Sequence, residues 1–246
     1  MAAVPQVPAD EWRTVLRHRA PLRWMHWINL ACLLALVGSG LQIFNAHPAL
    51  YWGQASDFAN PVVFIGDVPG WATIPSWQSL ALGRRWHFFF AWLWVINGAF
   101  YFAWSLASRH FEDELFMRRR DWRAIPRSIR EHLRFHHPVG DEALRYNPLQ
   151  KLAYVLVVFV LAPLMVLTGL SMSPQMDTVL GPWLQFIGGR QSARTLHFAV
   201  MAAFVLFAIV HVLMVVYAGP VNELRSMLTG RFRVRVPANA REPGDG

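Results

Sequence analysis

Four long stretches of the chain are apolar and contain no Asp, Glu, Lys or Arg: residues 24–56, 86–108, 152–176 and 195–222. Each stretch can supply the roughly 20 apolar residues that a helix needs to cross a membrane. The pattern therefore predicts membrane-spanning helices near 22–44, 86–108, 151–172 and 195–217. We expect an all-α integral membrane protein, built as a bundle of these four helices.

The positive charges are distributed unevenly between the predicted loops. Arginines precede the first span, fill the connection 109–150 and follow the fourth span, whereas the loop 45–83 has no Lys or Arg. Positive residues accumulate on the cytoplasmic side of membrane proteins. This places the lead 1–21, the inner loop 109–150 and the tail 218–246 in the cytoplasm, and the loop 45–83 outside. The net charge of +8 then reflects topology and attraction to anionic lipid rather than nucleic-acid binding.

Two of the cytoplasmic segments have recognisable character. Residues 111–136 place apolar side chains among arginines, which is typical of a basic amphipathic helix on a membrane surface. Residues 231–246 alternate arginines with apolar residues and then become polar, and we expect this end to be disordered.

Four histidines lie near the ends of the predicted spans, and two share one helix: His26, His87, His197 and His211. His197 and His211 are 211 − 197 = 14 residues apart, so they share a helix face at a separation of roughly 21 Å. With the predicted topology, His26 and His211 lie at the inner side of the membrane, and His87 and His197 at the outer side. Each depth-matched pair can supply two axial imidazoles to one haem iron, which leaves no open position.

The single cysteine, Cys32, limits the alternatives. It cannot form a thioether-linked haem site or a four-cysteine iron–sulfur cluster. The sequence therefore predicts two non-covalent haem b groups with bis-histidine ligation, enclosed by the helix bundle. A lone histidine inside a membrane can also be a packing residue or part of a proton relay, and that alternative remains open for each position.

Arginines and glycines near these histidines suggest further cofactor contacts. The pattern Arg-x-x-His opens three spans, so we expect Arg23, Arg84 and Arg194 to contact haem propionates, with Arg85 as a competitor of Arg84. Snorkelling of arginines at helix ends is the simpler explanation. Three glycines at the expected depth of the haems can pack against them: Gly38, Gly40 and Gly98. Glycine is also common in membrane helices generally.

The outer loop 45–83 is rich in aromatic residues, including Trp52, Trp71 and Trp77. A loop of this length usually has a function. Its aromatic residues can form a belt in the membrane interface or a docking surface for a protein partner. The sequence leaves both alternatives open, and names no quinone ligand.

These residues resemble the di-haem cytochrome b membrane subunits of formate dehydrogenase, nickel–iron hydrogenase and thiosulfate reductase, in the cytochrome b-561 superfamily. The resemblance rests on Arg23-Trp24-Met25-His26-Trp27, on Arg84-Arg85-Trp86-His87 and on the His197/His211 pair, and 39–48 looks most like the thiosulfate-reductase type. It implies the bacterial inner membrane, the same ligand pairs, and electron transfer between the quinone pool and an outer catalytic partner, of the molybdopterin or hydrogenase type.

We therefore expect an electron-transfer, quinone-reactive subunit of an oxidoreductase complex in a respiratory chain. A stand-alone cytochrome b that oxidises superoxide and reduces quinone is a second possibility, which purification with or without a partner would distinguish. A transporter with a histidine proton relay is a third, and it would show no haem absorption band.

Overall fold

A computed structural model describes residues 11–111, 116–133 and 147–236 of the chain. Four helical stretches within these residues are long and apolar enough to cross a membrane: α1 (Ala20–Phe44), α2 (Leu80–Ala107), the run Pro148–Ser171, and α7 (Arg190–Ala218). The predicted fold class, a helical membrane protein with four spans, is confirmed. Helices α2 and α7 begin earlier than the apolar windows because helical structure continues through the flanking arginines.

The third span is not a uniform α-helix. It consists of α4 (Pro148–Leu156), a π-helical turn at Val157–Leu161, and α5 (Ala162–Ser171). Asn147 caps its start, since its side-chain oxygen accepts from the amide of Leu149 at 3.0 Å and its own amide donates to Gln150 at 3.1 Å. Pro163 has no amide hydrogen to donate, and the wide π turn directly before it accommodates that missing bond.

The chain forms two units. One, called here the helical unit, comprises Met25–Ala107 and Tyr154–Val210. The other, called the terminal unit, comprises Met1–Trp24, Ser108–Ala153 and His211–Gly246. Each is described separately below.

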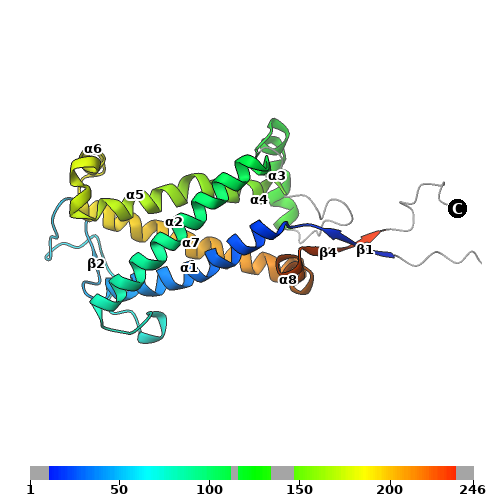
Figure 1. The fold of residues 1–246 in the computed structure, drawn as a ribbon. Coiled ribbons are helices and arrows are strands. Elements are labelled where there is room, and N and C mark those ends of the chain that lie inside the picture. Colours follow the sequence, from blue (N-terminus) through cyan, green and yellow to red (C-terminus); the bar gives the residue numbers. More distant parts are fainter. Residues whose placement is uncertain (1–10, 112–115, 134–146, 237–246) are drawn as a thin grey trace, which may run out of the picture. The chain divides into compact units, whose positions relative to one another are not determined.

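In the helical unit, α1, α2, α5 and α7 run alongside one another (Figure 1). Its polarity is the reverse of that of a soluble protein. Large apolar side chains are exposed along the helices, for example Leu34, Phe89, Trp92, Phe100 and Leu206. The fully buried side chains are mainly small and polar, namely Ser39, Gln42, Ser105, Thr168, Ser171 and Ser192, together with Cys32. Apolar surface that faces outward is suited to lipid, and small buried residues allow the helices to approach closely.

A loop at one end of the helical unit, residues 45–79, is attached to α1 by the side chain of Gln42 and is held internally by that of Asn45. Gln42 donates to the carbonyl of Ser79 at 2.6 Å and to Ser76 Oγ at 3.0 Å, and accepts from the amide of Ser76 at 3.2 Å. Asn45 bonds both the amide and the carbonyl of Val68, at 2.7 and 3.0 Å. The loop also contains a short antiparallel pair, β2 (Ala49–Leu50) with β3 (Val63–Phe64), and the single turn η1 (Gly70–Ala72).

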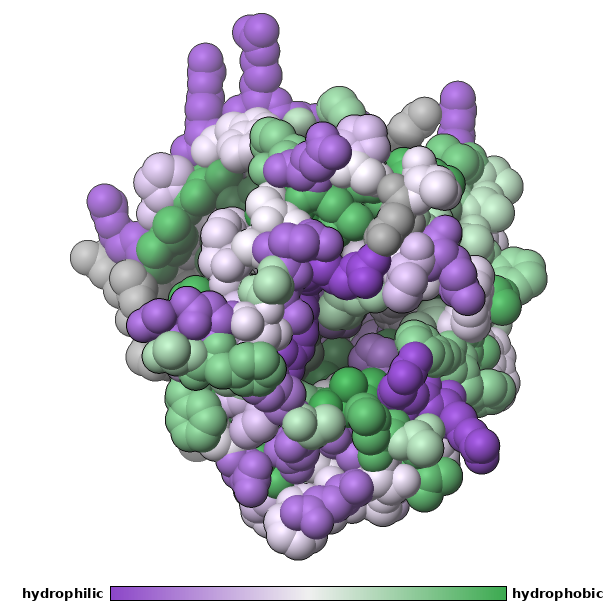
Figure 2. All heavy atoms as spheres, turned by 90° about the vertical axis from the view of Figure 1, so that its left-hand side faces the viewer, coloured by the Kyte–Doolittle hydropathy of each residue, from purple (hydrophilic) through white to green (hydrophobic). Residues whose placement is uncertain are grey.

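The other connection at this end contains the turn η5 (Pro174–Met176) and α6 (Asp177–Ile187). Its side chains Leu184 and Ile187 pack with Ala193 of α7 in a small apolar cluster. Figure 2 views the molecule from this end and shows hydrophobic patches interleaved with hydrophilic side chains.

In the terminal unit, the expectation of a disordered tail was wrong for residues 231–236. Strand β4 (Arg231–Val236) pairs antiparallel with β1 (Glu11–Leu16), as Figure 1 shows. Phe232 and Val234 are buried on one side of this ribbon. The alternation of arginine with apolar residues is therefore the period-2 pattern of a strand. Residues 237–246 lie outside the described part.

Helix α8 (Pro220–Thr229) leads into β4 and is tied to the start of the chain. Glu223 accepts from Arg17 Nη1 at 2.9 and 3.1 Å, and the Arg17 guanidinium lies 4.4 Å from the ring centre of Phe232. The predicted amphipathic stretch contains helix α3 (Arg119–Leu133), where the buried Asp121 lies 3.6 Å from Lys151 Nζ. Residues 112–115 and 134–136 of that stretch lie outside the described part.

Candidate haem-binding site

The structure places two of the four predicted histidines side by side. His87 lies two turns into α2 and His197 two turns into α7, and their ring centres are 6.2 Å apart at an interplanar angle of 66°. Both side chains are partly buried in the helical unit. The depth argument from the sequence predicted this juxtaposition.

The His87 ring is held by a buried hydroxyl group on α1. Ser39 Oγ lies 3.1 Å from His87 Nδ1 and donates its own proton to the carbonyl of Ala35 at 2.6 Å. A hydroxyl group has a single proton to donate. Ser39 must therefore accept a hydrogen bond from His87, which places the imidazole proton on Nδ1 and leaves the Nε2 lone pair free.

The His197 ring has the same arrangement with a hydroxyl group on α5. Thr168 Oγ1 lies 3.0 Å from His197 Nδ1 and donates to the carbonyl of Leu164 at 2.7 Å. By the same count of protons, His197 also carries its hydrogen on Nδ1. Both rings therefore have a free Nε2, which is the state that a metal-binding imidazole requires.

A glycine lies against each ring, directly after the residue with the hydroxyl group. A Cβ atom on Gly40 would come within 3.4 Å of His87 Cε1, and one on Gly169 within 3.3 Å of His197 Cε1. The distance at Gly169 is shorter than ordinary van der Waals contact, so a side chain there would displace the His197 ring, and the distance at Gly40 is at the short limit of ordinary contact. Gly40, a predicted packing residue, thus lies at this site, and its contact is with the histidine.

The spacing of the two rings fits one metal centre between them. An imidazole ring centre lies about 1.1 Å from Nε2 and a metal–imidazole bond is about 2.0 Å, so two rings that face one metal have centres about 6 Å apart. Within the described residues, no group of three or more His, Cys, Asp or Glu side chains could hold a metal ion by itself. Two imidazoles with no further protein ligand suit haem iron, because the porphyrin supplies the other four nitrogens.

The predicted inner pair belongs to both units and stays a prediction. His26, on α1 in the helical unit, packs edge-on against Trp27 with ring centres 5.3 Å apart. His211 lies on α7 in the terminal unit. Near His26, the buried Asn97 donates to the carbonyl of Met25 at 3.0 Å and to Asn29 Oδ1 at 2.8 Å.

The packing glycines differ in their surroundings. Gly98 follows Asn97 in α2, and a Cβ atom on it would meet nothing within 4 Å, so space is available beside it. Gly38 instead lies against the 45–79 loop, because a Cβ atom there would come within 2.8 Å of the Ile74 side chain. Contact of either glycine with haem stays a prediction.

The arginines that we expect to contact haem propionates have different surroundings in the structure. Arg194 donates to the carbonyls of His47 and Ala49, at 2.6 and 3.0 Å, and so attaches the 45–79 loop to α7. Arg23 donates to the carbonyl of Leu228 at 2.7 Å. Arg84 lies 5.8 Å from the ring centre of Phe88, and Arg85 is exposed. Their contact with propionates stays a prediction.

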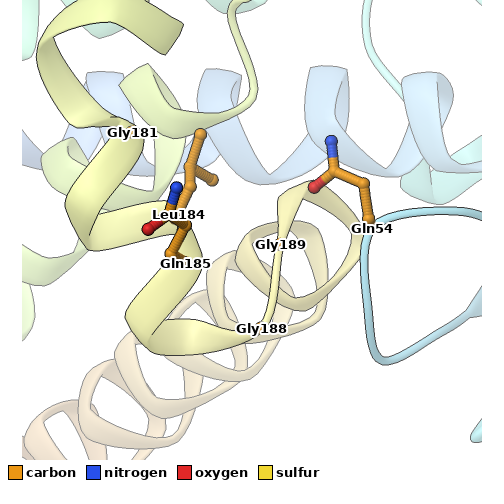
Figure 3. Close-up of a pocket in the computed structure, with 6 residues that line it drawn as sticks. All are labelled: Gln54, Gly181, Leu184, Gln185, Gly188 and Gly189. Atoms are coloured by element: carbon orange, nitrogen blue, oxygen red, sulfur yellow. The ribbon is translucent and has the colours of Figure 1, made fainter.

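The three tryptophans proposed for docking are accessible. Trp52, Trp71 and Trp77 are 57%, 88% and 49% exposed. Near Trp52, an open pocket of about 450 Å³ lies between the loop and α6, lined by Gln54, Leu184, Gln185 and three glycines (Figure 3). Gln54 closes one side of it by accepting from the amide of Arg190 at 3.0 Å. The histidine pair does not line this pocket.

Sequence reasoning missed three residues of the site: Ser39, Thr168 and Gly169. The available signal was a repeated dipeptide, Ser39-Gly40 in the first span and Thr168-Gly169 in the third. The third span has no histidine, so apart from this dipeptide the sequence gives no indication that it contributes to the site. It provides the contacts that orient His197.

The chain is similar to known membrane cytochromes over most of its length. The model of the family "Prokaryotic cytochrome b561" matches residues 17–230. A relative from Azospira oryzae, "Putative protein-methionine-sulfoxide reductase subunit YedZ1", is 31% identical over 80% of this chain and 89% of its own length. The "Probable Ni/Fe-hydrogenase B-type cytochrome subunit" of Cupriavidus necator is 28% identical over 79% of this chain and 76% of its own length. The chain therefore belongs to the prokaryotic cytochrome b561 family of multi-pass membrane proteins that bind b-type haem and transfer electrons.

Proposed function

We propose that this protein is a di-haem cytochrome b subunit that carries electrons between an oxidoreductase on the outer face of the bacterial inner membrane and the quinone pool. The observation that carries the proposal is the His87–His197 pair, whose ring centres lie 6.2 Å apart in an edge arrangement with both Nδ1 atoms bonded to hydroxyl groups. His87 and His197 would both ligate the haem iron, so the site would be suited to electron transfer and not to binding of a substrate at the metal.

Haem b, when bound, supplies one-electron redox chemistry to this site. His87 and His197 would hold it through Nε2. Ser39 and Thr168 keep the imidazole protons on Nδ1, and Gly40 and Gly169 allow the rings to lie close to the neighbouring helices. The exposed apolar surfaces of α2 and α7 keep the helices in lipid, so water has little access to the pair.

The second haem is proposed at His26 and His211. The distance between His197 and His211 along α7 is about 21 Å, so one metal centre lies near each membrane surface. Electrons then cross the membrane in two steps if the donor and the acceptor are at opposite ends. We place quinone at the inner end, without naming its ligands, and the partner at the outer end.

The proposed partner surface is the 45–79 loop. It contains Asp57 and Asp67 but no Lys or Arg, and it exposes Trp52, Trp71 and Trp77. Hydrogen bonds to Gln42, Asn45 and Arg194 fix the loop. A fixed aromatic surface loses little conformational entropy on binding, which favours docking. The names of the two relatives, a reductase subunit and a hydrogenase subunit, support a catalytic partner. The molybdopterin or hydrogenase type of that partner is what the family resemblance implies.

Haem analysis of purified variants tests the histidine assignment. We expect non-covalent protohaem at about two per chain in the pyridine haemochrome assay. His87→Ala and His197→Ala should each remove the same haem, and His26→Ala and His211→Ala the other. A single haem in the wild type, or a spectrum of His87→Ala that matches His26→Ala, contradicts the pairing.

Co-purification tests the partner surface. Replacement of Trp52, Trp71 and Trp77 together by alanine should reduce recovery of the partner from solubilised membranes, while both haems stay bound and reducible by dithionite. Leu206→Ala, at an exposed apolar position on α7, is the matched control and should retain the partner. Unchanged recovery in the triple variant contradicts docking at this loop.

A further inference from the structure

The two hydroxyl groups at the histidine pair form one repeated arrangement. Ser39 on α1 and Thr168 on α5 are each 0% exposed, and each donates to the carbonyl four residues earlier while it lies 3.0–3.1 Å from a histidine Nδ1. The residues come from different helices and reach different histidines. Hydroxyl side chains in membrane helices commonly donate to the carbonyl one turn earlier. Here each hydroxyl group also contacts a histidine ring, and the same arrangement occurs twice.

The direction of these hydrogen bonds has a consequence for the metal. An imidazole that donates a hydrogen bond from Nδ1 gains electron density at Nε2 and becomes a more basic ligand. A more basic ligand stabilises the ferric state, which has the higher charge, relative to the ferrous state. Hydrogen bonding around the ligands is one of the means by which a protein sets the potential of haem.

We propose that Ser39 and Thr168 are positioning residues that fix His87 and His197 as Nδ1–H tautomers and lower the reduction potential of the haem that these histidines hold. The inference rests on the proposed function, because it requires that His87 and His197 bind haem. It adds a role in setting the potential for one haem, through side chains that do not touch the metal.

The experiment is a potentiometric titration of purified protein in lipid nanodiscs, with haem content measured in parallel. Thr168→Val keeps the shape of the side chain and removes the hydroxyl acceptor, and Ser39→Ala removes the hydroxyl acceptor on α1. Loss of one hydrogen bond to a ligand should favour the ferrous state by about fivefold. This corresponds to a rise of about 40 mV in the reduction potential, because a tenfold change in the equilibrium constant is about 59 mV for a one-electron couple.

Two further variants separate hydrogen bonding from packing. Thr168→Ser restores the hydroxyl group with less volume and should return the potential to that of the wild type. Ser171→Ala removes a buried hydroxyl group on the same helix, which among the described residues donates to the carbonyl of Leu167 at 2.6 Å, and it should leave both potentials unchanged. The rise should affect one haem only, the one that is lost in His87→Ala.

The outcomes distinguish the two levels of the proposal. If His87→Ala and His197→Ala remove one haem but Thr168→Val and Ser39→Ala leave its potential unchanged, the role of the hydroxyl groups is overturned and the proposed function stands. An equal change in Thr168→Val and Thr168→Ser would also overturn it, because volume and not hydrogen bonding would then be responsible. If haem content is insensitive to His87 and His197, the proposed function itself fails. Loss of haem in Thr168→Val with retention in Thr168→Ser supports the positioning role.

Discussion

Gln42 is a polar residue inside an apolar membrane-spanning helix, and its replacement by leucine gives a quantitative test of how the 45–79 loop is held. Its side chain is 1% exposed and makes three hydrogen bonds, all to residues just before α2. Leucine has a similar volume but no polar atom. The substitution therefore removes the bonds and leaves the helix packing largely intact.

The expected cost follows from these bonds. Each contributes about 1 kcal/mol net, so their loss should amount to about 3 kcal/mol. The Ser79 carbonyl still accepts from the amide of Gly83 at 2.9 Å, but the amide of Ser76 loses its partner Gln42 and adds to the cost where water cannot reach it. At 1.4 kcal/mol for each factor of ten, local opening of the loop becomes roughly a hundredfold more frequent. If the helices stay in place when the loop opens, only the amides of the loop will exchange faster.

Hydrogen exchange measured by mass spectrometry in nanodiscs reports that opening. Amides of peptides covering 68–79 should exchange about a hundredfold faster in Gln42→Leu, while peptides from α7 remain unchanged. The matched control is Gln175→Leu, since Gln175 is exposed and accepts one bond from Ser173 at 3.3 Å. Unchanged exchange in Gln42→Leu, or equal acceleration in both variants, would refute this account of the loop.

Three other substitutions test the remaining packing. Gly169→Val should displace the His197 ring and lower haem content, measured by pyridine haemochrome, because even a single Cβ atom would lie 3.3 Å from that ring. Gly230→Ala should lower the free energy of unfolding by about 2 kcal/mol, measured by denaturation in detergent, because φ is +82° and the Cβ atom would lie 2.8 Å from a backbone carbonyl. Glu223→Gln removes the Arg17 ion pair and should cost about 1 kcal/mol in low salt. A smaller loss at 1 M salt is expected, and a cost that is the same at both salt concentrations would contradict an electrostatic origin.

The positions of the spans and the depth of the histidines could be predicted from the sequence, because both depend on local regularities. A charge-free run of sufficient length indicates a span, and the helical rise converts residue number into depth. His87 and His197 could be paired by this depth alone. Their hydroxyl partners could not, because the rotation of each helix about its axis decides which side chain meets the ring. Ser and Thr are also common in membrane helices without any such role.

The terminal ribbon was missed for a different reason. The alternation Arg231, Phe232, Arg233, Val234 is a strand pattern, but a strand needs a partner, and β1 lies at the opposite end of the chain. The pairing joins residues more than 200 positions apart, as in Glu11 with Val236. No local signal indicates such a partner. The arginines were interpreted as a solvated tail, whereas the apolar positions between them are buried.

The site also explains why the bundle needs its third span, which has no histidine. A ring on α7 that faces a ring on α2 is free to rotate unless its other nitrogen is held. α5 provides that restraint for His197 through Thr168 and Gly169, as α1 does for His87 through Ser39 and Gly40. Each histidine is thus supported by a different helix, and all four spans contribute to one histidine pair. A bundle without α5 would keep both imidazoles but would lose the hydrogen bond that orients one of them.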